Sequence, residues 1–139
     1  MLRAMASCVA SLVLFGCTQV PPDGPISVQE AIERIHQLDG QTVEVHGWLG
    51  HCAGYDCALY ISKDDAETVA YGDWESDQWL EAMDRRLSIG ANKSFDHRAA
   101  PFQFQRVAIK GKIDATCRGM FYVCTDRVPD IVPHSIAEI

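Results

Sequence analysis

The chain has 139 residues, of which 19 are acidic and 12 are basic, and its formal net charge at pH 7 is −7. A chain of this length builds one domain around one hydrophobic core, and not two. Its acidic balance disfavours DNA or RNA as a partner, because binding to phosphates needs Lys and Arg to displace counterions.

The N-terminal segment has the pattern of an export signal. Arg3 precedes an apolar run from Cys8 to Phe15, and this run is shorter than the roughly 20 residues that a helix needs to span a bilayer. The run leads into Leu14-Phe15-Gly16-Cys17, with a small residue directly before the cysteine. At this point an ordinary secretory signal and an uncleaved anchor remain alternatives to a lipoprotein signal.

The segment Leu14–Cys17 resembles the lipobox of bacterial lipoproteins, although Phe15 departs from the small or β-branched residue usual there. The resemblance implies that residues 1–16 are a signal peptide and that Cys17 is lipidated and becomes the first residue of the mature chain. Thr18, in place of Asp, implies sorting to the outer membrane, on the side facing the periplasm. Lipid on Cys17 then makes the membrane contact.

Residues 17–25 predict a tether, because three prolines and a glycine in this stretch cannot hold a helix.

An amphipathic helix is expected next. Ser27 is a suitable N-cap and Glu30 follows three residues later, as in a capping box. Gly40 suits the end of this helix. Its apolar stripe is Val28, Ala31, Ile32, Ile35 and Leu38.

The remaining chain predicts mainly strands. Residues 41–50 and 106–114 alternate apolar and polar side chains with a period of two, which is typical of a strand with one buried face. Residues 58–62 predict a further strand with Leu59 and Ile61 inward. Further strands are expected over 87–90 and 131–139, and Pro133 restricts the last one to an edge or a bulge. Short helices are expected within 63–67, 76–86 and 94–101.

This order of elements resembles the OB-fold, a five-stranded, partly open Greek-key barrel with a helix between its third and fourth strands. Gly47 and Gly111 lie in mid-strand, where a barrel must coil. The resemblance implies a mainly β fold with minor α over residues 26–139, a small five-stranded OB-like barrel preceded by the N-terminal amphipathic helix. The chain thus resembles a lipobox lipoprotein with a single OB-fold-like mature domain.

Four cysteines lie in the loops after the strands at 41–50 and 106–114: Cys52, Cys57, Cys117 and Cys124. In an exported domain an even set predicts two disulfides, and the local pairs Cys52–Cys57 and Cys117–Cys124 are favoured over crossed pairs. Two alternatives remain. Four thiolates could hold zinc, or the thiols could serve an envelope enzyme, with His51 and Asp56 beside two of them. Two disulfides imply no cofactor and no metal.

The loops at 50–57 and 114–130 are expected to leave the same end of the barrel and to flank a ligand face. The candidate residues of that face are Trp48, Tyr55, Tyr60, Lys110 and Lys112. Exposed aromatics could stack a base or sugar. A basic stripe late in the chain keeps single-stranded nucleic acid as a second alternative; its residues are Arg106, Lys110, Lys112, Arg118 and Arg127. Two simpler interpretations compete with it: residues 63–86 or the first helix cover Trp48, and Glu44 pairs with Lys110 or Lys112 across the strands.

These observations together predict a lipid-anchored cell-envelope protein with a non-enzymatic binding or structural role. Its expected partners are the membrane, through lipid on Cys17, and an envelope protein or small ligand at the loop-flanked face. Fold analogy supplies the binding face, and a fold does not fix a function.

Overall fold

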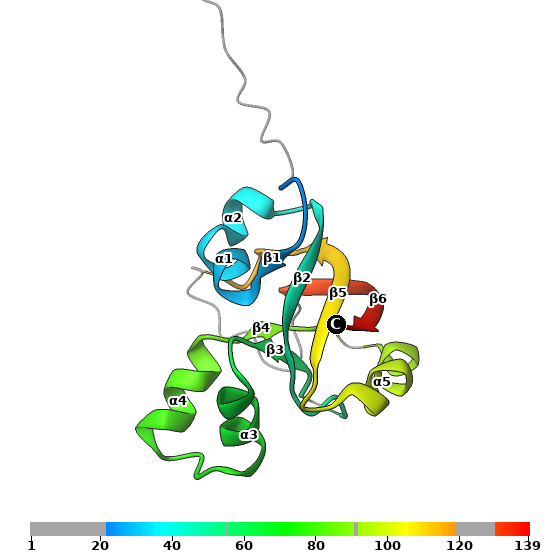
Figure 1. Ribbon diagram of the computed structural model, residues 1–139. Coiled ribbons are helices and arrows are strands. Elements are labelled where there is room, and N and C mark those ends of the chain that lie inside the picture. Colours follow the sequence, from blue (N-terminus) through cyan, green and yellow to red (C-terminus); the bar gives the residue numbers. More distant parts are fainter. Residues whose placement is uncertain (1–21, 55, 91, 119–129) are drawn as a thin grey trace, which may run out of the picture.

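The computed structural model describes residues 22–54, 56–90, 92–118 and 130–139 (Figure 1). Its centre is a sheet of six strands in which the main path runs β4-β3-β2-β5-β6, all neighbours antiparallel. The short strand β1 pairs parallel with β2. The strands are β1 (Ile26–Ser27), β2 (Thr42–Leu49), β3 (Ala58–Tyr60), β4 (Leu87–Ser88), β5 (Arg106–Ile113) and β6 (Ile131–Glu138).

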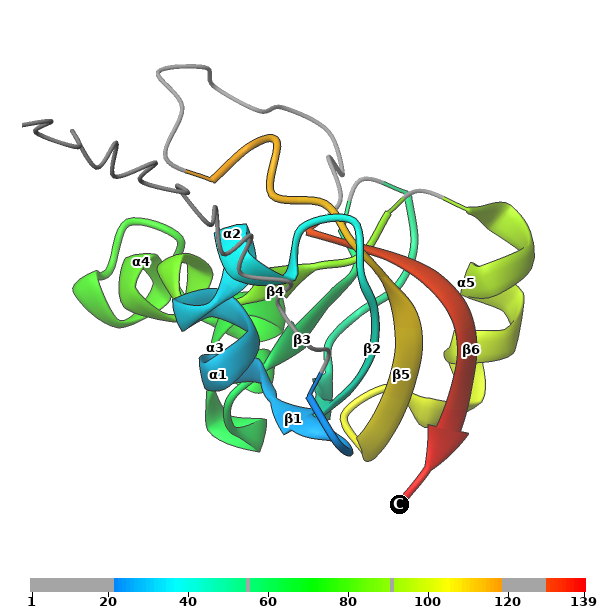
Figure 2. The same ribbon diagram turned by 90° about the horizontal axis from the view of Figure 1, so that it is seen from above.

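Helices take up a share of the described chain comparable to that of strands, so the domain is mixed rather than mainly β. Figure 2 shows α3 and α4 on one side of the sheet and α5 on the other. The helices are α1 (Val28–Glu33), α2 (Ile35–Leu38), α3 (Lys63–Tyr71), α4 (Asp77–Asp84), α5 (Lys93–Ala99) and the 3₁₀ helix η1 (Ala100–Phe102). In the described ranges, no helix is long and apolar enough to cross a membrane.

Side-chain caps explain where the later helices begin. The side chains of Ser62, Ser76 and Asn92 accept hydrogen bonds from backbone N–H groups in the first turns of α3, α4 and α5. Each cap satisfies a donor that has no partner within the helix. The sequence predicted only a turn at 63–67, whereas the helix that Ser62 caps extends to Tyr71.

The N-terminal helix is interrupted. Ser27 caps it as expected, accepting from the Glu30 N–H at 3.1 Å, but Ile26 and Ser27 also form β1. The single helix predicted over this region breaks at Arg34, whose φ of −107° and ψ of 13° lie outside the helical range. Glu30, expected in a capping box, instead forms an ion pair with Arg34. The apolar stripe is nonetheless buried in one core, including Val28, Ala31, Ile35 and Leu38.

The central pair β2 and β5 confirms the period-two prediction. Val43 and Val45 are buried opposite Gly111 and Ile109, and the polar residues between them point the other way. Glu44 is the register partner of Lys110, as expected from an antiparallel pair. Within β3 and its extension, Leu59 is buried but Ile61 is 39% exposed. The inward prediction for Ile61 is therefore wrong, because the strand ends at Tyr60 and Ser62 already caps α3.

Strand β6 contains an irregularity at its proline. The register with β5 shifts between Lys110 and Gly111, so that Gly111 faces Pro133 and Lys110 faces Ser135. This is the edge or bulge position predicted for Pro133, which has no N–H to donate to a ladder. A Cβ on Gly111 would lie 2.5 Å from the carbonyl oxygen of Val132, so only glycine fits this close approach.

The sheet does not close into a barrel. Its two edge strands, β4 and β6, approach each other at one isolated parallel bridge, Ile89↔Ile131. Two backbone hydrogen bonds flank the bridge, from Gly90 N to Ile131 O at 3.0 Å and from Asp130 N to Ser88 O at 2.9 Å. One bridge is less than a ladder of paired residues, so the predicted five-stranded, partly open barrel is not confirmed, and the structure has an open, coiled sheet of six strands.

Candidate functional site

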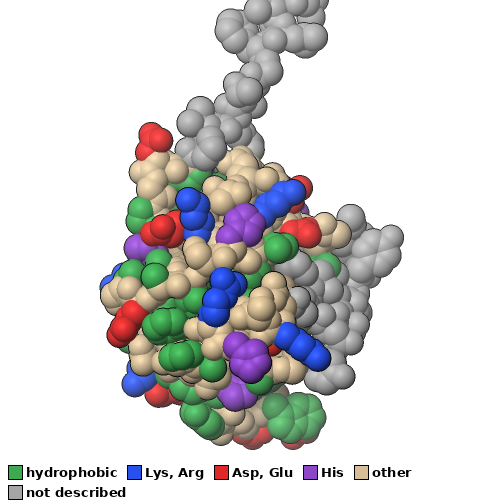
Figure 3. All heavy atoms as spheres, turned by 90° about the vertical axis from the view of Figure 1, so that its right-hand side faces the viewer, with side chains coloured by type: hydrophobic (Ala, Val, Ile, Leu, Met, Phe, Trp, Pro, Cys, Tyr) green, Lys and Arg blue, Asp and Glu red, His purple; other side chains and the backbone are tan. Residues whose placement is uncertain are grey.

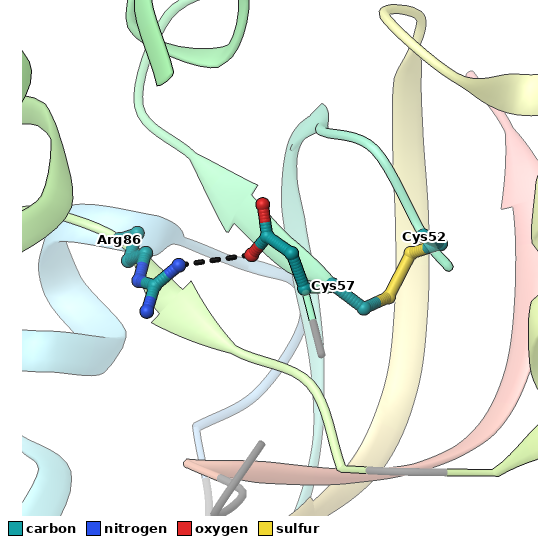
Figure 4. The surroundings of a disulfide bond; sticks show 4 residues. Cys52, Cys57 and Arg86 are labelled. Atoms are coloured by element: carbon teal, nitrogen blue, oxygen red, sulfur yellow. Dashed lines mark hydrogen bonds and ion pairs between the residues drawn. A yellow bond between two sulfur atoms is a disulfide. The ribbon is translucent and has the colours of Figure 1, made fainter. Parts of the chain in front are cut away.

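The loop that joins β2 to β3 is closed by a disulfide between Cys52 and Cys57, with their Cα atoms 4.1 Å apart (Figure 4). This confirms the local pairing predicted for these two cysteines. Within the loop, Ala53 and Asp56 exchange two backbone hydrogen bonds, at 3.0 and 3.3 Å. Gly54 has a φ of +60°, the left-handed region that favours glycine in so tight a turn. Tyr55 lies outside the described residues.

The loop has a buried base and an exposed tip. Cys52 and Cys57 are 3% and 1% exposed and belong to the main core cluster. His51, Ala53 and Gly54 are exposed. The disulfide therefore fixes the loop to the core, while its outer residues remain accessible to solutes.

Neither sulfur of this pair is a thiolate, so Cys52 and Cys57 are not available as zinc ligands or nucleophiles in this state. Cys117 is also disulfide-bonded, and its predicted partner Cys124 lies outside the described residues, as does Cys17. No group of three or more potential metal ligands occurs in the described part of the chain.

Arg86, which directly precedes β4, connects the two cysteine loops. Its Nη1 donates to Asp56 Oδ1 at 2.9 Å, as drawn in Figure 4. Its carbonyl oxygen accepts a hydrogen bond of 2.6 Å from Nη2 of Arg118, the residue that follows Cys117. Arg118 in turn forms two hydrogen bonds with the carboxylate of Asp130, which is 4% exposed. Four charged residues from distant segments thus form one connected series.

The route by which the loops meet differs from the one expected. Strands β2 and β5 are antiparallel, so the loops that follow them leave opposite ends of this pair, and the expectation of a shared end is wrong. The coiling of the sheet brings them together instead. Ile131 pairs with Ile113 at the end of β5 and also bridges to Ile89 beyond β4. Arg86, the residue before β4, forms hydrogen bonds with Asp56 of the first loop and with Arg118 of the second.

Burial and charge shift the pKa values of three groups near these loops. Burial raises the pKa of Tyr60 to about 12, the carboxylate of Asp56 adds to the rise, and Arg86 opposes it. The hydrogen bond to Asp130 raises the pKa of Arg118 against the opposing effect of burial. Hydrogen bonds from Thr116 lower the pKa of Asp114. Each shift favours the charge state that the present contacts require: neutral Tyr60, cationic Arg118 and anionic Asp114.

Two hollows flank the disulfide-closed loop. The first, of about 350 Å³, lies between the loop and α5 and is lined by Cys52, Ala53, Gly54, Lys93, Asp96, His97, Ala100 and Gln103. The second, of about 310 Å³, lies towards the end of α3 and is lined by His51, Asp56, Val69, Ala70, Tyr71 and Gln103. Residues of the loop line both hollows, so the loop lies between them, and Gln103 borders both.

The predicted ligand face is divided in the structure. Trp48 and Tyr60 are register partners on β2 and β3, but they pack in a second core cluster with Ala66 and Val69 of α3. Tyr60 is only 1% exposed, so its ring offers no stacking surface. The interpretation that residues 63–86 cover Trp48 is therefore confirmed.

Lys110 and Lys112 are exposed on β5, opposite Glu44 and Thr42. Trp48 lies on the same face of the sheet, opposite Arg106, but α3 packs over Trp48 and Tyr60 and leaves only the lysine end of this face open. Figure 3 shows the α5 side of the molecule, where basic and histidine side chains occur as separate groups rather than as one continuous patch.

Comparison with protein families, curated proteins and solved structures finds no match. What the site does is therefore inferred from its sequence pattern and geometry. Sequence reasoning missed Arg86, His97 and Gln103 as site residues. Arg86 is 30 residues from Asp56 and 32 from Arg118 along the chain, so no local pattern points to this junction.

Proposed function

We propose that this chain is a lipid-anchored protein of the bacterial cell envelope that binds an envelope protein or a small ligand and catalyses no reaction. The binding surface is the loop Gly50–Cys57 together with its two flanking hollows. The anchor is lipid on Cys17, in the outer membrane facing the periplasm.

The observation that carries the binding role is the fixed position of an exposed loop. Three interactions fix the conformation of the loop. They are the Cys52–Cys57 disulfide, the backbone hydrogen bonds between Ala53 and Asp56, and the Asp56–Arg86 ion pair. A recognition loop that is already ordered loses little conformational entropy on binding, which increases its affinity. The adjacent hollows offer a partner a concave surface on each side of the loop.

The proposed location depends on the sequence and is supported by the cysteines. The Leu14-Phe15-Gly16-Cys17 segment supplies the lipidation signal. Disulfides form and persist in oxidising compartments such as the bacterial periplasm, and the described cysteines Cys52, Cys57 and Cys117 are all disulfide-bonded.

For the fold, we propose an open variant of the OB architecture. The path β4-β3-β2-β5-β6, the helix α5 before β5, and the parallel contact of Ile89 with Ile131 support this relationship. In this proposal the hairpin of α3 and α4 is an insertion between the second and third barrel strands, and it occupies the outer face where OB-folds place ligands. The ligand surface is then displaced to the disulfide-closed loop.

The anchor is tested with the full chain expressed in a bacterial host. Cys17→Ser should move the protein from the membrane fraction to the soluble periplasmic fraction, whereas Cys8→Ser, inside the apolar run, should leave it in the membrane. Mass spectrometry of the unmutated protein should find an acylated N-terminal Cys17. An unmutated protein that keeps residues 1–16 and carries no acyl chain would contradict lipidation.

The binding role is tested by site-specific photocrosslinking in the same cells. A photoreactive amino acid at His51, on the exposed part of the loop, should give a discrete adduct. The same amino acid at His36, an exposed residue on α2, is the control. Adducts of equal yield and size at both positions, or none at His51, would count against the loop as the binding surface.

A further inference from the structure

The hairpin of α3 and α4 carries a second exposed surface, which adjoins the second hollow beside the disulfide-closed loop at Tyr71. Both helices contribute little to the core, with Ala66 and Ala82 as their buried residues. The indole Nε1 of Trp79 donates to the carbonyl oxygen of Val69 at 3.2 Å and joins the two helices. The hairpin projects from the sheet (Figure 1), so its far end is free to meet another molecule.

Two aromatic side chains are displayed at this far end. Tyr71 is 76% exposed and Trp74 is 68% exposed, the highest values among the large hydrophobic side chains described. The Tyr71 ring lies 5.4 Å from the ring of Phe104, which supports it on one side. Large aromatic side chains gain most when they are buried, and Trp and Tyr are the residues that most often dominate protein interfaces.

The turn between the helices is held in one conformation by its own hydrogen bonds. Gly72 N donates to Thr68 O at 2.8 Å, and Glu75 N donates to Asp73 Oδ1 at 3.0 Å. The hydroxyl of Ser76 donates to the carbonyl oxygen of Asp73 at 2.7 Å. Trp74 is therefore presented on an ordered turn rather than on a loose strand of chain.

The carboxylates around the aromatics are not neutralised. Asp73, Glu75, Asp77 and Glu81 are exposed, and residues 71–81 contain no Lys or Arg. Two other acids of the hairpin form ion pairs, Asp65 with Arg85 and Glu67 with Lys63. Among the ion pairs of the described residues, none involves the four carboxylates of this turn.

We propose that residues 71–81, here called the acidic–aromatic turn, dock a cationic segment of a partner protein. Arg or Lys side chains of the partner lie over the faces of Trp74 and Tyr71 and form charge-assisted hydrogen bonds with the surrounding carboxylates. An aromatic centre with a charged rim is the usual anatomy of such an interface. Charge complementarity selects this occupant, since the net charge of −7 opposes a second copy of the chain and the carboxylates oppose an anionic membrane.

The test uses the full chain, purified with its disulfides formed, and a synthetic peptide of alternating Arg and Gly as the probe. Binding is measured by titration calorimetry at about 0.15 M salt. The triple variant Asp73→Asn, Glu75→Gln, Asp77→Asn should weaken binding about tenfold or more, and Trp74→Ala should weaken it about fivefold. A matched triple variant at exposed acids away from the turn, Asp23→Asn, Glu33→Gln, Glu138→Gln, changes the net charge equally and should have less than about a twofold effect.

Three results would overturn the proposal. Equal losses of affinity in the two triple variants would show that the peptide is attracted to the overall negative charge of the protein and not to the turn. Unchanged affinity in Trp74→Ala and in the turn variant would place the peptide elsewhere. Binding of the turn to phosphatidylcholine–phosphatidylglycerol vesicles or to a soluble glycan, with no binding of the peptide, would assign the aromatics to a lipid or carbohydrate surface. Unchanged melting temperatures of the variants show that the fold is kept, because all the substituted side chains are exposed.

Discussion

The guanidinium of Arg118 forms two hydrogen bonds with the carboxylate of Asp130, from Nε to Oδ1 at 2.9 Å and from Nη2 to Oδ2 at 2.6 Å. Asp130 Oδ2 also accepts from the backbone N–H of Ser88 at 2.8 Å. The pair therefore joins the end of the second cysteine loop to the edge strand β4, at the place where the sheet comes closest to closing.

Removal of the Asp130 side chain should lower the free energy of unfolding more than removal of a surface carboxylate. Asp130→Ala leaves the cationic Arg118 and the Ser88 N–H without their partner in a largely buried place, so the free energy of unfolding should fall by about 2 to 3 kcal/mol. Asp65→Ala is the matched control, because its partner Arg85 is half exposed. The control should lose less than about 1 kcal/mol. Urea unfolding measures both, and equal losses would contradict the special role of Asp130.

Stability should fall at high pH because of Tyr60. Burial raises the pKa of Tyr60 to about 12 from 10.0, so the neutral phenol stabilises the fold fully below pH 10. This contribution, about 2 to 3 kcal/mol, is lost as the pH rises from about 10 to about 12. Unfolding free energies measured across this range should show a steeper decline in the unmutated protein than in Tyr60→Phe. Tyr71→Phe, at an exposed position, is the control, and an identical slope in all three proteins would exclude Tyr60 as the cause.

A side chain at Gly111 should disrupt the contact between β5 and β6. In Gly111→Val the Cβ would lie 2.5 Å from Val132 O and 2.8 Å from Cγ1 of Ile131. We expect a loss of about 3 kcal/mol or more, or failure to fold, because backbone cannot move away as a side chain can. Ala108→Val introduces the same side chain on the outer face of β5 and should change the melting temperature little. An unchanged melting temperature in Gly111→Val would contradict the close approach.

The Cys52–Cys57 disulfide should give a modest stabilisation. It closes a loop with a sequence separation of 5, for which the chain-entropy model gives about 2 kcal/mol. The double variant Cys52→Ser, Cys57→Ser should therefore unfold at lower urea concentration under oxidising conditions, yet still fold. Photocrosslinking from position 51 should decline in the same variant, because the loop is no longer fixed to the core. Full retention of both properties would show that the ion pair and the Ala53–Asp56 backbone hydrogen bonds suffice to position the loop.

Periodicity and local chemistry predicted much of the fold. Alternation in β2 and β5 identified the inward residues Val45 and Ile109, and short spacing identified the Cys52–Cys57 pair. The helix predicted within 76–86 is present as α4, which Ser76 caps. Pro133 was placed correctly because its missing N–H restricts it wherever it occurs.

Features that depend on the path of the whole chain were not predictable in this way. Ile61 looks like an inward strand residue, but the cap at Ser62 ends the strand before it. The junction at Arg86 depends on how distant segments of the chain pack. The coil of the sheet, which brings Ile89 to Ile131, comes from strand twist summed over several strands, and no single window of sequence encodes it.

The parallel pairing of β1 with β2 has a mechanical consequence. Ile26 lies beside Val45 and Ser27 beside His46, directly after the segment expected to lead to the membrane. In the proposed lipid-anchored protein, tension along residues 17–25 would load this pairing in shear, so that its backbone hydrogen bonds would share the force. The pairing would then protect the helix that follows β1 from unravelling first.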